Sequence, residues 1–355
     1  MVQTLVDGLP AIAPGLKLFH VNPRLSRDAT DVGSWRPGKL LILIAACLRA
    51  VGLRLRHGPM NFYYVPAPGR RAPLYRDWMV MLLCRLFFRR LILHWHGVGL
   101  GHWLTNNATA PERWLTQILL GRADLALVLA PQLAADAQAL HPRNVLVVPN
   151  GVPDPGPDPI PPPVSTNPTQ ILFLGLCTPA KGLFDTLTAV AVANRREAHG
   201  FQLLVAGRFT NRRDEEAFYS QAHALGPGVV RHVGFADETK KHAFFAEADV
   251  FCFPTIHPFE GQPLSLIEAL AHDLPIITTR WRAIPGMLPA DRVWFVNAGR
   301  PDQIAHALIA CRHAGTRHGE RRAHFLTHYT RERHLAVLAA ALATLEPVNP
   351  GQAPA

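Results

Sequence analysis

A proline-rich run in the middle of the chain constrains the fold more than any other feature. Seven of the eleven residues from Pro153 to Pro163 are proline. Proline has no backbone N–H and a fixed φ, so such a run joins neither a helix nor a sheet interior and favours extended polyproline geometry. At 355 residues the chain is also too long for one ordinary core. We therefore expect two domains joined by a semi-rigid linker over residues 153–168.

Short apolar runs alternate with helical patterns on both sides of this linker. Expected strands cover residues 16–21, 61–65, 91–95, 125–130, 145–148, 171–174, 202–206, 229–233, 250–254 and 276–279. Expected helices cover residues 39–51, 74–88, 183–195, 213–225, 240–246 and 264–272. The alternation predicts an α/β protein with two doubly wound domains, 1–152 and 169–328, each around a parallel sheet that binds ligands at the carboxyl ends of its strands. The last segment, 329–355, contains an Ala/Leu-rich helix over 331–345 that can pack back on the first domain.

Charge is distributed unevenly between the halves. Residues 1–150 hold 17 Lys and Arg against 7 Asp and Glu, whereas residues 151–355 hold 19 of each. A basic half predicts contact with an anionic surface or polymer. The excess is arginine within a sheet domain and no recognition motif accompanies it, which argues against nucleic acid. The segment 74–90, apolar with flanking arginines, suits a helix at a membrane surface, although an ordinary packed helix fits it slightly better.

Other bulk features point to a cytoplasmic protein. The longest apolar run, Leu40–Leu48, is too short to span a membrane, and the N-terminus lacks a signal-peptide pattern. The five cysteines are scattered and odd in number, which indicates reduced core residues. No metal-ligand spacing is found, so we expect no metal.

The segment Phe259–Ala271 carries the most chemical information. It places Glu260 in a Gly/Pro-containing loop and Glu268 inside an apolar helix, whose first turn suits Pro263. Backbone amides and the positive end of the helix dipole between the two carboxylates can hold phosphate. This arrangement suits a phosphorylated, hydroxyl-rich ligand such as a nucleotide sugar. The alternative is a loop acid and a helix glutamate that faces solvent.

Two cations follow strands of the second half. Lys181 precedes Gly182 and a helix start, where the dipole disfavours a cation, so a role as a point charge toward phosphate is the better interpretation. Arg208 follows the next strand, where it either reaches the same site or is an exposed charge.

In combination, the order of these motifs over most of residues 170–290 resembles the nucleotide-sugar half of retaining, family 4-like glycosyltransferases of the GT-B fold. Glu260 to Leu264 resembles members that build bacterial surface polysaccharides, including exopolysaccharides. The resemblance implies metal-independent hexosyl transfer from a UDP- or GDP-sugar, without a cofactor, to an oligosaccharide or lipid-linked acceptor. An acceptor of that kind would explain the basic half, through peripheral contact with the anionic inner face of the membrane.

The resemblance also implies residue roles. Lys181 would grip the donor diphosphate, Glu260 and the amides of Gly261 and Gln262 would face the transferred sugar, and Glu268 would bind the ribose. Phe235 would lie near the base, although a plain core position fits it better. The remaining donor-site positions are Gly175, Gly182, Pro263 and Leu264.

The chain departs from the family pattern at two positions. Leu176 stands where the family has an arginine, which Arg208 can replace, and Gly33 alone remains of a Gly-Gly pair in an acceptor-side loop. An inactive, membrane-associated relative that serves as an assembly partner therefore stays an alternative. A dinucleotide oxidoreductase is disfavoured because no G-x-G-x-x-G follows an expected strand.

The strand Leu91–Trp95 runs into a His-x-His-Gly sequence. Because a strand alternates its faces, His94 and His96 point the same way and could form a metal pair, although no third ligand is evident. The resemblance implies instead that His96 meets the donor sugar from the acceptor side.

Overall fold

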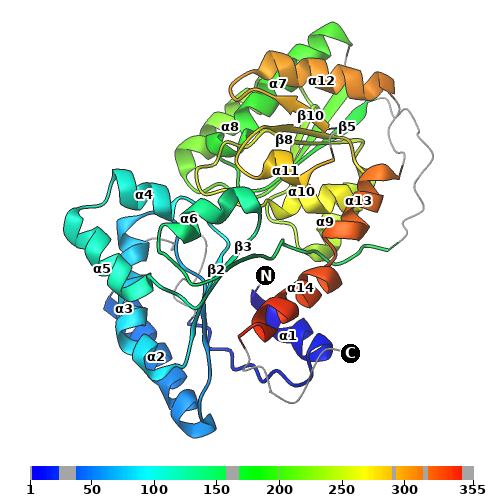
Figure 1. Cartoon of the computed structure of the whole chain (residues 1–355). Coiled ribbons are helices and arrows are strands. Elements are labelled where there is room, and N and C mark those ends of the chain that lie inside the picture. The colour runs from blue at the N-terminus through cyan, green and yellow to red at the C-terminus, as the bar shows by residue number, and fades with distance from the viewer. Residues whose placement is uncertain are drawn as a thin grey trace. The chain divides into compact units, whose positions relative to one another are not determined.

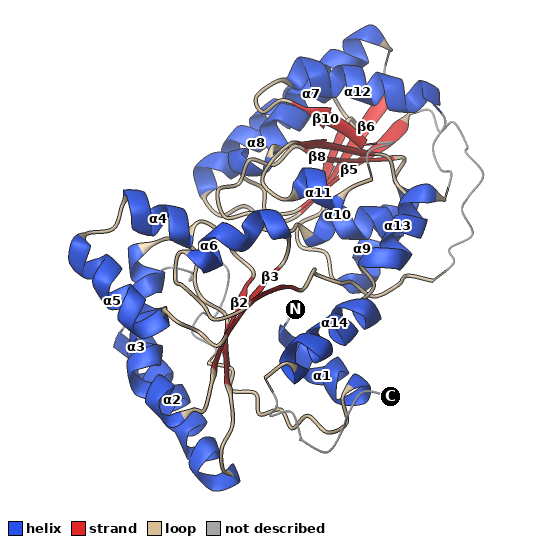
Figure 2. Cartoon of the chain, viewed as in Figure 1, coloured by secondary structure: helices blue, strands red, loops and turns tan. Residues whose placement is uncertain are grey.

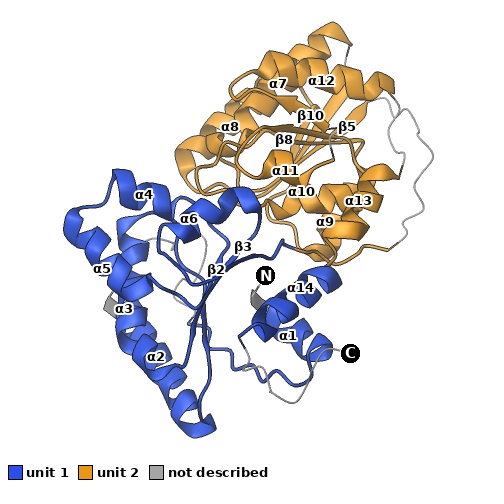
Figure 3. Ribbon diagram, in the orientation of Figure 1, with its two compact units in different colours: residues 1–150, 331–355 blue, residues 151–330 orange. Residues whose placement is uncertain are grey.

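The computed structural model describes residues 2–23, 37–156, 168–198, 200–289, 293–314 and 319–345. These residues divide into two compact units (Figures 1 and 3), unit 1 from the ranges 1–150 and 331–355 and unit 2 from the range 151–330. Most of the predicted linker, residues 157–167, lies outside the described residues, as does Gly33. None of the described helices combines the length and the apolar character that a bilayer-spanning segment needs.

Unit 1 is built on a four-stranded parallel sheet in the order β1-β2-β3-β4. Its strands are β1 (Phe62–Tyr64), β2 (Leu91–Trp95), β3 (Leu125–Val128) and β4 (Val145–Val147). Strands that follow one another in sequence are neighbours in the sheet, so right-handed crossovers place their helices on one face. These helices are α3 (Arg71–Cys84), η1 (Arg85–Phe87), α4 (Leu100–Asn106), α5 (Ala110–Leu120), η2 (Pro131–Leu133) and α6 (Ala134–Gln138). Helix α2 (Pro37–His57) precedes β1 and packs on the same face, against α3.

Helices from the two ends of unit 1 cover the other face of this sheet. These are α1 (Val2–Ile12) and α14 (Arg331–Ala343), which also pack against each other. Successive side chains of β2 point to opposite faces of the sheet. Leu91 and Leu93 pack with the helices of the first face, whereas Ile92 packs with α1 and α14.

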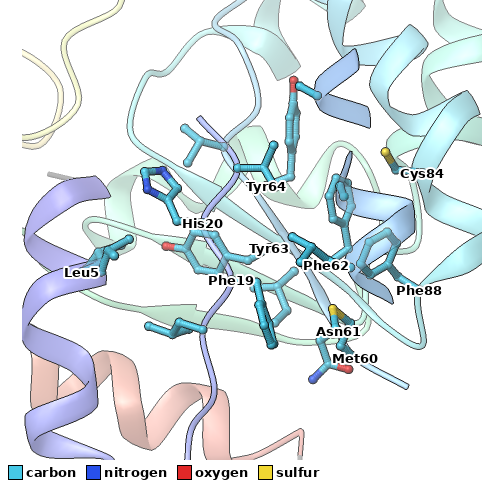
Figure 4. A pocket seen from close by; sticks show the side chains of 18 of the residues that line it. Leu5, Phe19, His20, Met60, Asn61, Phe62, Tyr63, Tyr64, Cys84 and Phe88 are labelled. Carbon is cyan, nitrogen blue, oxygen red and sulfur yellow. The ribbon is translucent and has the colours of Figure 1, made fainter. Parts of the chain in front are cut away.

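The strand predicted over residues 16–21 is wrong. Residues 16–23 are described but belong to no strand, and no other strand of the described ranges pairs with the outer edge of β1. The segment instead lines a largely apolar cavity of about 730 Å³ beside β1, where Phe19 and His20 lie near Tyr63 (Figure 4). A short apolar run can thus line a cavity without forming a ladder. Each of the other nine predicted strands is present, with bounds that shift by at most two residues.

Unit 2 contains a six-stranded parallel sheet in the order β10-β9-β8-β5-β6-β7. Its strands are β5 (Thr169–Leu174), β6 (Phe201–Ala206), β7 (Val230–His232), β8 (Val250–Phe253), β9 (Ile276–Thr279) and β10 (Val293–Val296). The chain enters at β5, runs outward to β7, and returns on the other side of β5 as β8. The strand order therefore reverses between β5 and β8, and the carboxyl ends of strands at such a switch point are where open α/β sheets bind ligands.

Helices cover both faces of this second sheet (Figure 2). They are η3 (Pro179–Lys181), α7 (Leu183–Arg196), α8 (Arg212–Ala224), α9 (Glu238–Glu247), α10 (Leu264–Ala271), α11 (Ile284–Met287), α12 (Pro301–Ala314) and α13 (Glu320–His328). Helix α7 packs with α12, and α10 packs with α13 on the opposite side. The predicted two-domain α/β architecture with a parallel sheet in each half is confirmed. In unit 2, the strand β10 and the helices α11, α12 and α13 were not anticipated.

Candidate active site

The loops that follow β5 and β8 meet in an ion pair at the strand switch point. Lys181 ends η3 in the first loop and Glu260 lies in the second. Lys181 Nζ lies 2.5 Å from Glu260 Oε2, and the two side chains are only 13% and 10% exposed. The buried Thr255 hydroxyl donates to the same carboxylate oxygen at 3.1 Å. The structure thus brings together two predicted catalytic residues that are 79 positions apart.

Gly182 fixes the direction in which Lys181 points. Its φ of +82° lies in the left-handed region, and a Cβ there would lie 2.5 Å from the carbonyl oxygen of Pro254. Only glycine combines that conformation with so close a backbone approach. The amide of Ile256 also donates to the carbonyl of Ala180 at 2.8 Å, which ties the two loops together.

Gly175 directly follows β5 and lies close to β8 and to the loop after β6. A Cβ at Gly175 would lie 3.0 Å from the ring of Phe253, and a Cβ at Gly207 would overlap the carbonyl of Gly175. Both glycines therefore permit close packing of the loops after β5 and β6. Gly207 had no signal in the sequence beyond following a strand, because its need for a bare backbone depends on the neighbouring loop.

Arg208 and Phe235 form an exposed pair at the carboxyl ends of β6 and β7. The Arg208 guanidinium carbon lies 4.6 Å from the centroid of the Phe235 ring. Phe235 is 62% exposed, so the interpretation of this residue as plain core is wrong. The pair offers a cation on an aromatic surface, which can stack a flat ring. Leu176 is exposed in the neighbouring loop.

Glu268 pairs with a lysine that sequence reasoning missed. Lys241 Nζ of α9 lies 2.5 Å from Glu268 Oε1 and 2.9 Å from Glu238 Oε1. Burial raises the pKa of Glu268, and the adjacent ammonium opposes that rise. Lys240 and Lys241 are adjacent in sequence, so only the packing of α9 on the sheet decides which of them reaches Glu268.

The N-terminus of α10 follows directly after Glu260. Gly261, Gln262 and Pro263 are buried, and Pro263 is the cap residue, one position before the predicted first turn. Leu264 begins the helix and is exposed. The positive end of the helix dipole therefore lies beside the Lys181–Glu260 pair, which favours a bound anion.

His96 lies in unit 1, just past the carboxyl end of β2. Its ring centroid lies 4.2 Å from that of the fully buried His94, in keeping with their two-residue spacing, and His334 of α14 lies 6.5 Å from His94. Burial lowers the pKa of all three imidazoles, that of His96 to about 4, so they are neutral at pH 7. His94 Nδ1 bonds the Tyr63 hydroxyl. No group of three potential ligands in the described ranges is arranged to hold a metal ion.

The sequence of unit 2 matches a known family model. Residues 168–313 match the model described as "Glycosyl transferases group 1". Residues 168–313 are a glycosyl transferases group 1 domain. This domain contains the Lys181–Glu260 pair, Arg208 and Glu268.

Relatives and solved structures agree with this assignment. The chain is 26% identical over 223 residues to the colanic acid biosynthesis glycosyltransferase WcaL of Escherichia coli. The aligned residues cover 61% of this chain and 53% of that protein. It is 34% identical over 145 residues to the phosphatidyl-myo-inositol mannosyltransferase of Mycobacterium leprae, which covers 39% of this chain and 36% of that protein. The chain thus spans about half the length, or less, of these relatives.

Structural similarity extends over both units. Anabaena Alr3699/HepE in complex with UDP-glucose has a TM-score of 0.64 at 16% identity, which covers 87% of this chain and 84% of that one. At this identity the likeness shows the fold alone. The chain has the two-domain GT-B fold of glycosyltransferases.

Proposed function

We propose that the protein is a glycosyltransferase that moves a sugar from a nucleoside diphosphate sugar to a glycan acceptor in polysaccharide biosynthesis. The observation that carries this proposal is the Lys181–Glu260 pair beside the N-terminus of α10, at the switch point of a glycosyl transferases group 1 domain. The names of WcaL and of the UDP-glucose complex of Alr3699/HepE support the reaction class and the donor class.

In this proposal, residues 169–328 bind the donor and residues 1–152 bind the acceptor. The bond between the sugar's anomeric carbon and the diphosphate breaks as the acceptor hydroxyl oxygen attacks from the same face, so the hexosyl configuration is retained. Two negative charges develop on the leaving diphosphate, and Lys181 with the amides at the start of α10 stabilises them. A leaving-group oxygen takes the acceptor proton. Side-chain and backbone donors thus supply the charge that a metal would otherwise provide.

The other site residues have roles in binding. Glu268 accepts hydrogen bonds from the ribose hydroxyls, and its pairing with Lys241 keeps a carboxylate available despite burial. Arg208 and Phe235 hold the base or a phosphate at the ends of β6 and β7. Neutral His96 hydrogen-bonds the transferred sugar from the acceptor side.

We also propose a lipid-linked acceptor and a cytoplasmic location at the inner face of the membrane. The net charge of +10 on residues 1–150 supports contact with anionic lipid. The Mycobacterium leprae relative is named for an acceptor that is itself a lipid, phosphatidyl-myo-inositol.

A donor screen followed by a transfer assay tests the function. A panel of UDP- and GDP-sugars is added to the purified protein, and the cognate donor should raise its melting temperature because it binds only the folded state. Transfer with that donor should persist in EDTA and fall in Glu260→Gln. Loss of transfer in EDTA would refute metal independence, and stabilisation by no sugar nucleotide would refute the donor class.

One observation favours a second candidate, an inactive assembly partner. Leu176 is exposed in the loop after β5, where the family's arginine is expected, and within the described residues Lys181 is the cation of that loop that pairs with Glu260. Donor binding without transfer or hydrolysis on any acceptor tested would favour this candidate.

A further inference from the structure

Exposed apolar side chains concentrate on one part of unit 1. We call the solvent side of α2, α3, η1 and α5 the outer helical face. Eleven of the 21 large exposed hydrophobic residues in the described ranges lie on these four elements. The most exposed include Leu41, Leu48, Leu55, Leu82, Leu86 and Trp114. Scattered exposed leucines are ordinary, whereas such a concentration marks an interaction surface.

The four elements present their exposed sides in a common direction. Leu43 of α2, Met81 of α3 and Leu120 of α5 belong to one buried cluster with Leu93 of β2, so all three helices rest on the same sheet face. Helix α3 packs with both α2 and α5. Figure 1 shows α2, α3 and α5 along one side of unit 1. Their opposite sides therefore form a continuous surface.

Helix α2 has an apolar stripe on its exposed side. Leu41, Leu48 and Leu55 are 65–70% exposed and recur every seven residues, which returns to nearly the same side of a helix. The helix also buries Leu43 and Cys47 on its other side. It is thus apolar on the side that faces solvent as well as on the side that faces the core.

The charges of the outer helical face have one sign. Helix α2 contains no Asp or Glu. The acids of α3 and α5 are Asp77 and Glu112, which are buried at 0% and 7% exposure and paired with arginines. Arg49 and Arg56 of α2 are exposed beside the leucine stripe. A surface of exposed leucines and arginines without an exposed carboxylate is complementary to anionic lipid headgroups over an acyl region.

We propose that the outer helical face docks this protein on an anionic lipid bilayer, with α2 lying in the interfacial plane. This proposal identifies the surface that makes the membrane contact proposed above. It rests on the proposed function only for the purpose of that contact, which is access to a lipid-linked acceptor. A second copy of the chain is a poorer occupant, because two such faces would bring arginines together without carboxylates to pair with them. The arginines supply attraction to the surface, and the leucines supply burial at the headgroup boundary.

Vesicle co-sedimentation of the full chain tests the proposal. The protein should bind vesicles of phosphatidylcholine with about 30% phosphatidylglycerol, and bind pure phosphatidylcholine at least about tenfold more weakly. Leu41→Glu/Leu48→Glu/Leu55→Glu should lose at least about tenfold in affinity for the anionic vesicles. Arg49→Gln/Arg56→Gln should bind more weakly and depend less on salt. The matched control is Tyr219→Glu/Leu326→Glu, which changes exposed residues of unit 2 and should bind as the wild type does.

Three outcomes would overturn the proposal. Wild-type protein that binds neither vesicle type would refute it. A triple leucine variant that binds the anionic vesicles with wild-type affinity would also refute it. A wild-type oligomer that the leucine substitutions convert to monomer, without an effect on vesicle binding, assigns the face to self-association. Circular dichroism establishes that each variant is folded. Melting-temperature shifts with sugar nucleotides are measured on the same samples, so a failure of the donor assignment is separable from a failure of docking.

Discussion

Removing the charge of Lys181 without removing its bulk probes both stability and catalysis. In Lys181→Met, Glu260 keeps the Thr255 hydroxyl and loses its cation, although its side chain is only 10% exposed. Breaking a fully buried ion pair by removing one partner costs about 3–5 kcal/mol. Because both side chains here retain some solvent contact, we expect the free energy of unfolding to fall by about 2–3 kcal/mol.

The same substitution should damage transfer by a different route. Loss of one positioned donor to a developing charge costs about 2–4 kcal/mol of transition-state stabilisation, which corresponds to a reduction of kcat/KM by about 30- to 900-fold. Glu260→Gln should also lose activity. In the double variant the stability losses should be smaller than their sum, because neither residue then leaves a buried charge behind, with a coupling energy of about 1–3 kcal/mol.

Urea denaturation and initial-rate kinetics on the four proteins of this cycle provide the measurement. The control is Arg212→Met, which breaks an exposed pair with Glu216 on α8 and should change stability by less than about 0.5 kcal/mol. Additive stability losses would refute the ion pair. A Lys181→Met enzyme whose kcat/KM stays within about threefold of wild type would remove Lys181 from the mechanism.

Three further predictions follow from glycine geometry, a buried carboxylate and buried imidazoles. Gly182→Ala should lower the free energy of unfolding by about 2–4 kcal/mol in urea denaturation, because the new Cβ meets a left-handed φ and overlaps Pro254. A loss under about 1 kcal/mol would contradict this. The control is Gly226→Ala, which has a similar φ but open space around it and should cost less. Lys241→Met should raise the pKa of Glu268 further, because it removes the ammonium that stabilises the carboxylate. As the pH falls, the variant should therefore lose donor affinity at a higher pH than the wild type does. A pH profile of donor affinity that does not shift would remove Glu268 from donor binding. Because the pKa of His96 falls from 6.5 to about 4 on folding, the unfolded state binds more protons below pH 6.5, and this group should cost about 2 kcal/mol of stability by pH 5; His96→Gln should flatten the measured pH dependence.

The amino-acid sequence contains enough local information for most elements and for the candidate residues. Runs rich in apolar and β-branched residues, such as Leu91–Trp95 and Ile276–Thr279, predicted the bounds of their strands correctly. Both strands are buried on both faces, so the run itself is a sufficient signal. The spacing of Glu260 and Glu268 and the Lys181–Gly182 step are also local. These local patterns indicate a phosphate-binding chemistry without any knowledge of tertiary contacts.

Tertiary structure decided which of these residues meet. The pairing of Lys181 with Glu260 depends on β8 returning beside β5, an order that no local pattern encodes. The partner of Glu268 is Lys241 and not Lys240, because α9 packs in one rotation only.

Exposure was also decided by packing. Residues 16–21 have the pattern of a strand but line a cavity, and Phe235 has the character of a core residue but lies in solvent. Helix α2 has apolar residues both on its exposed side and on the side that packs on the sheet, and the sequence alone does not tell which of the two is buried. Periodicity specifies which side of an element is apolar, whereas what covers that side depends on contacts between segments far apart in the chain.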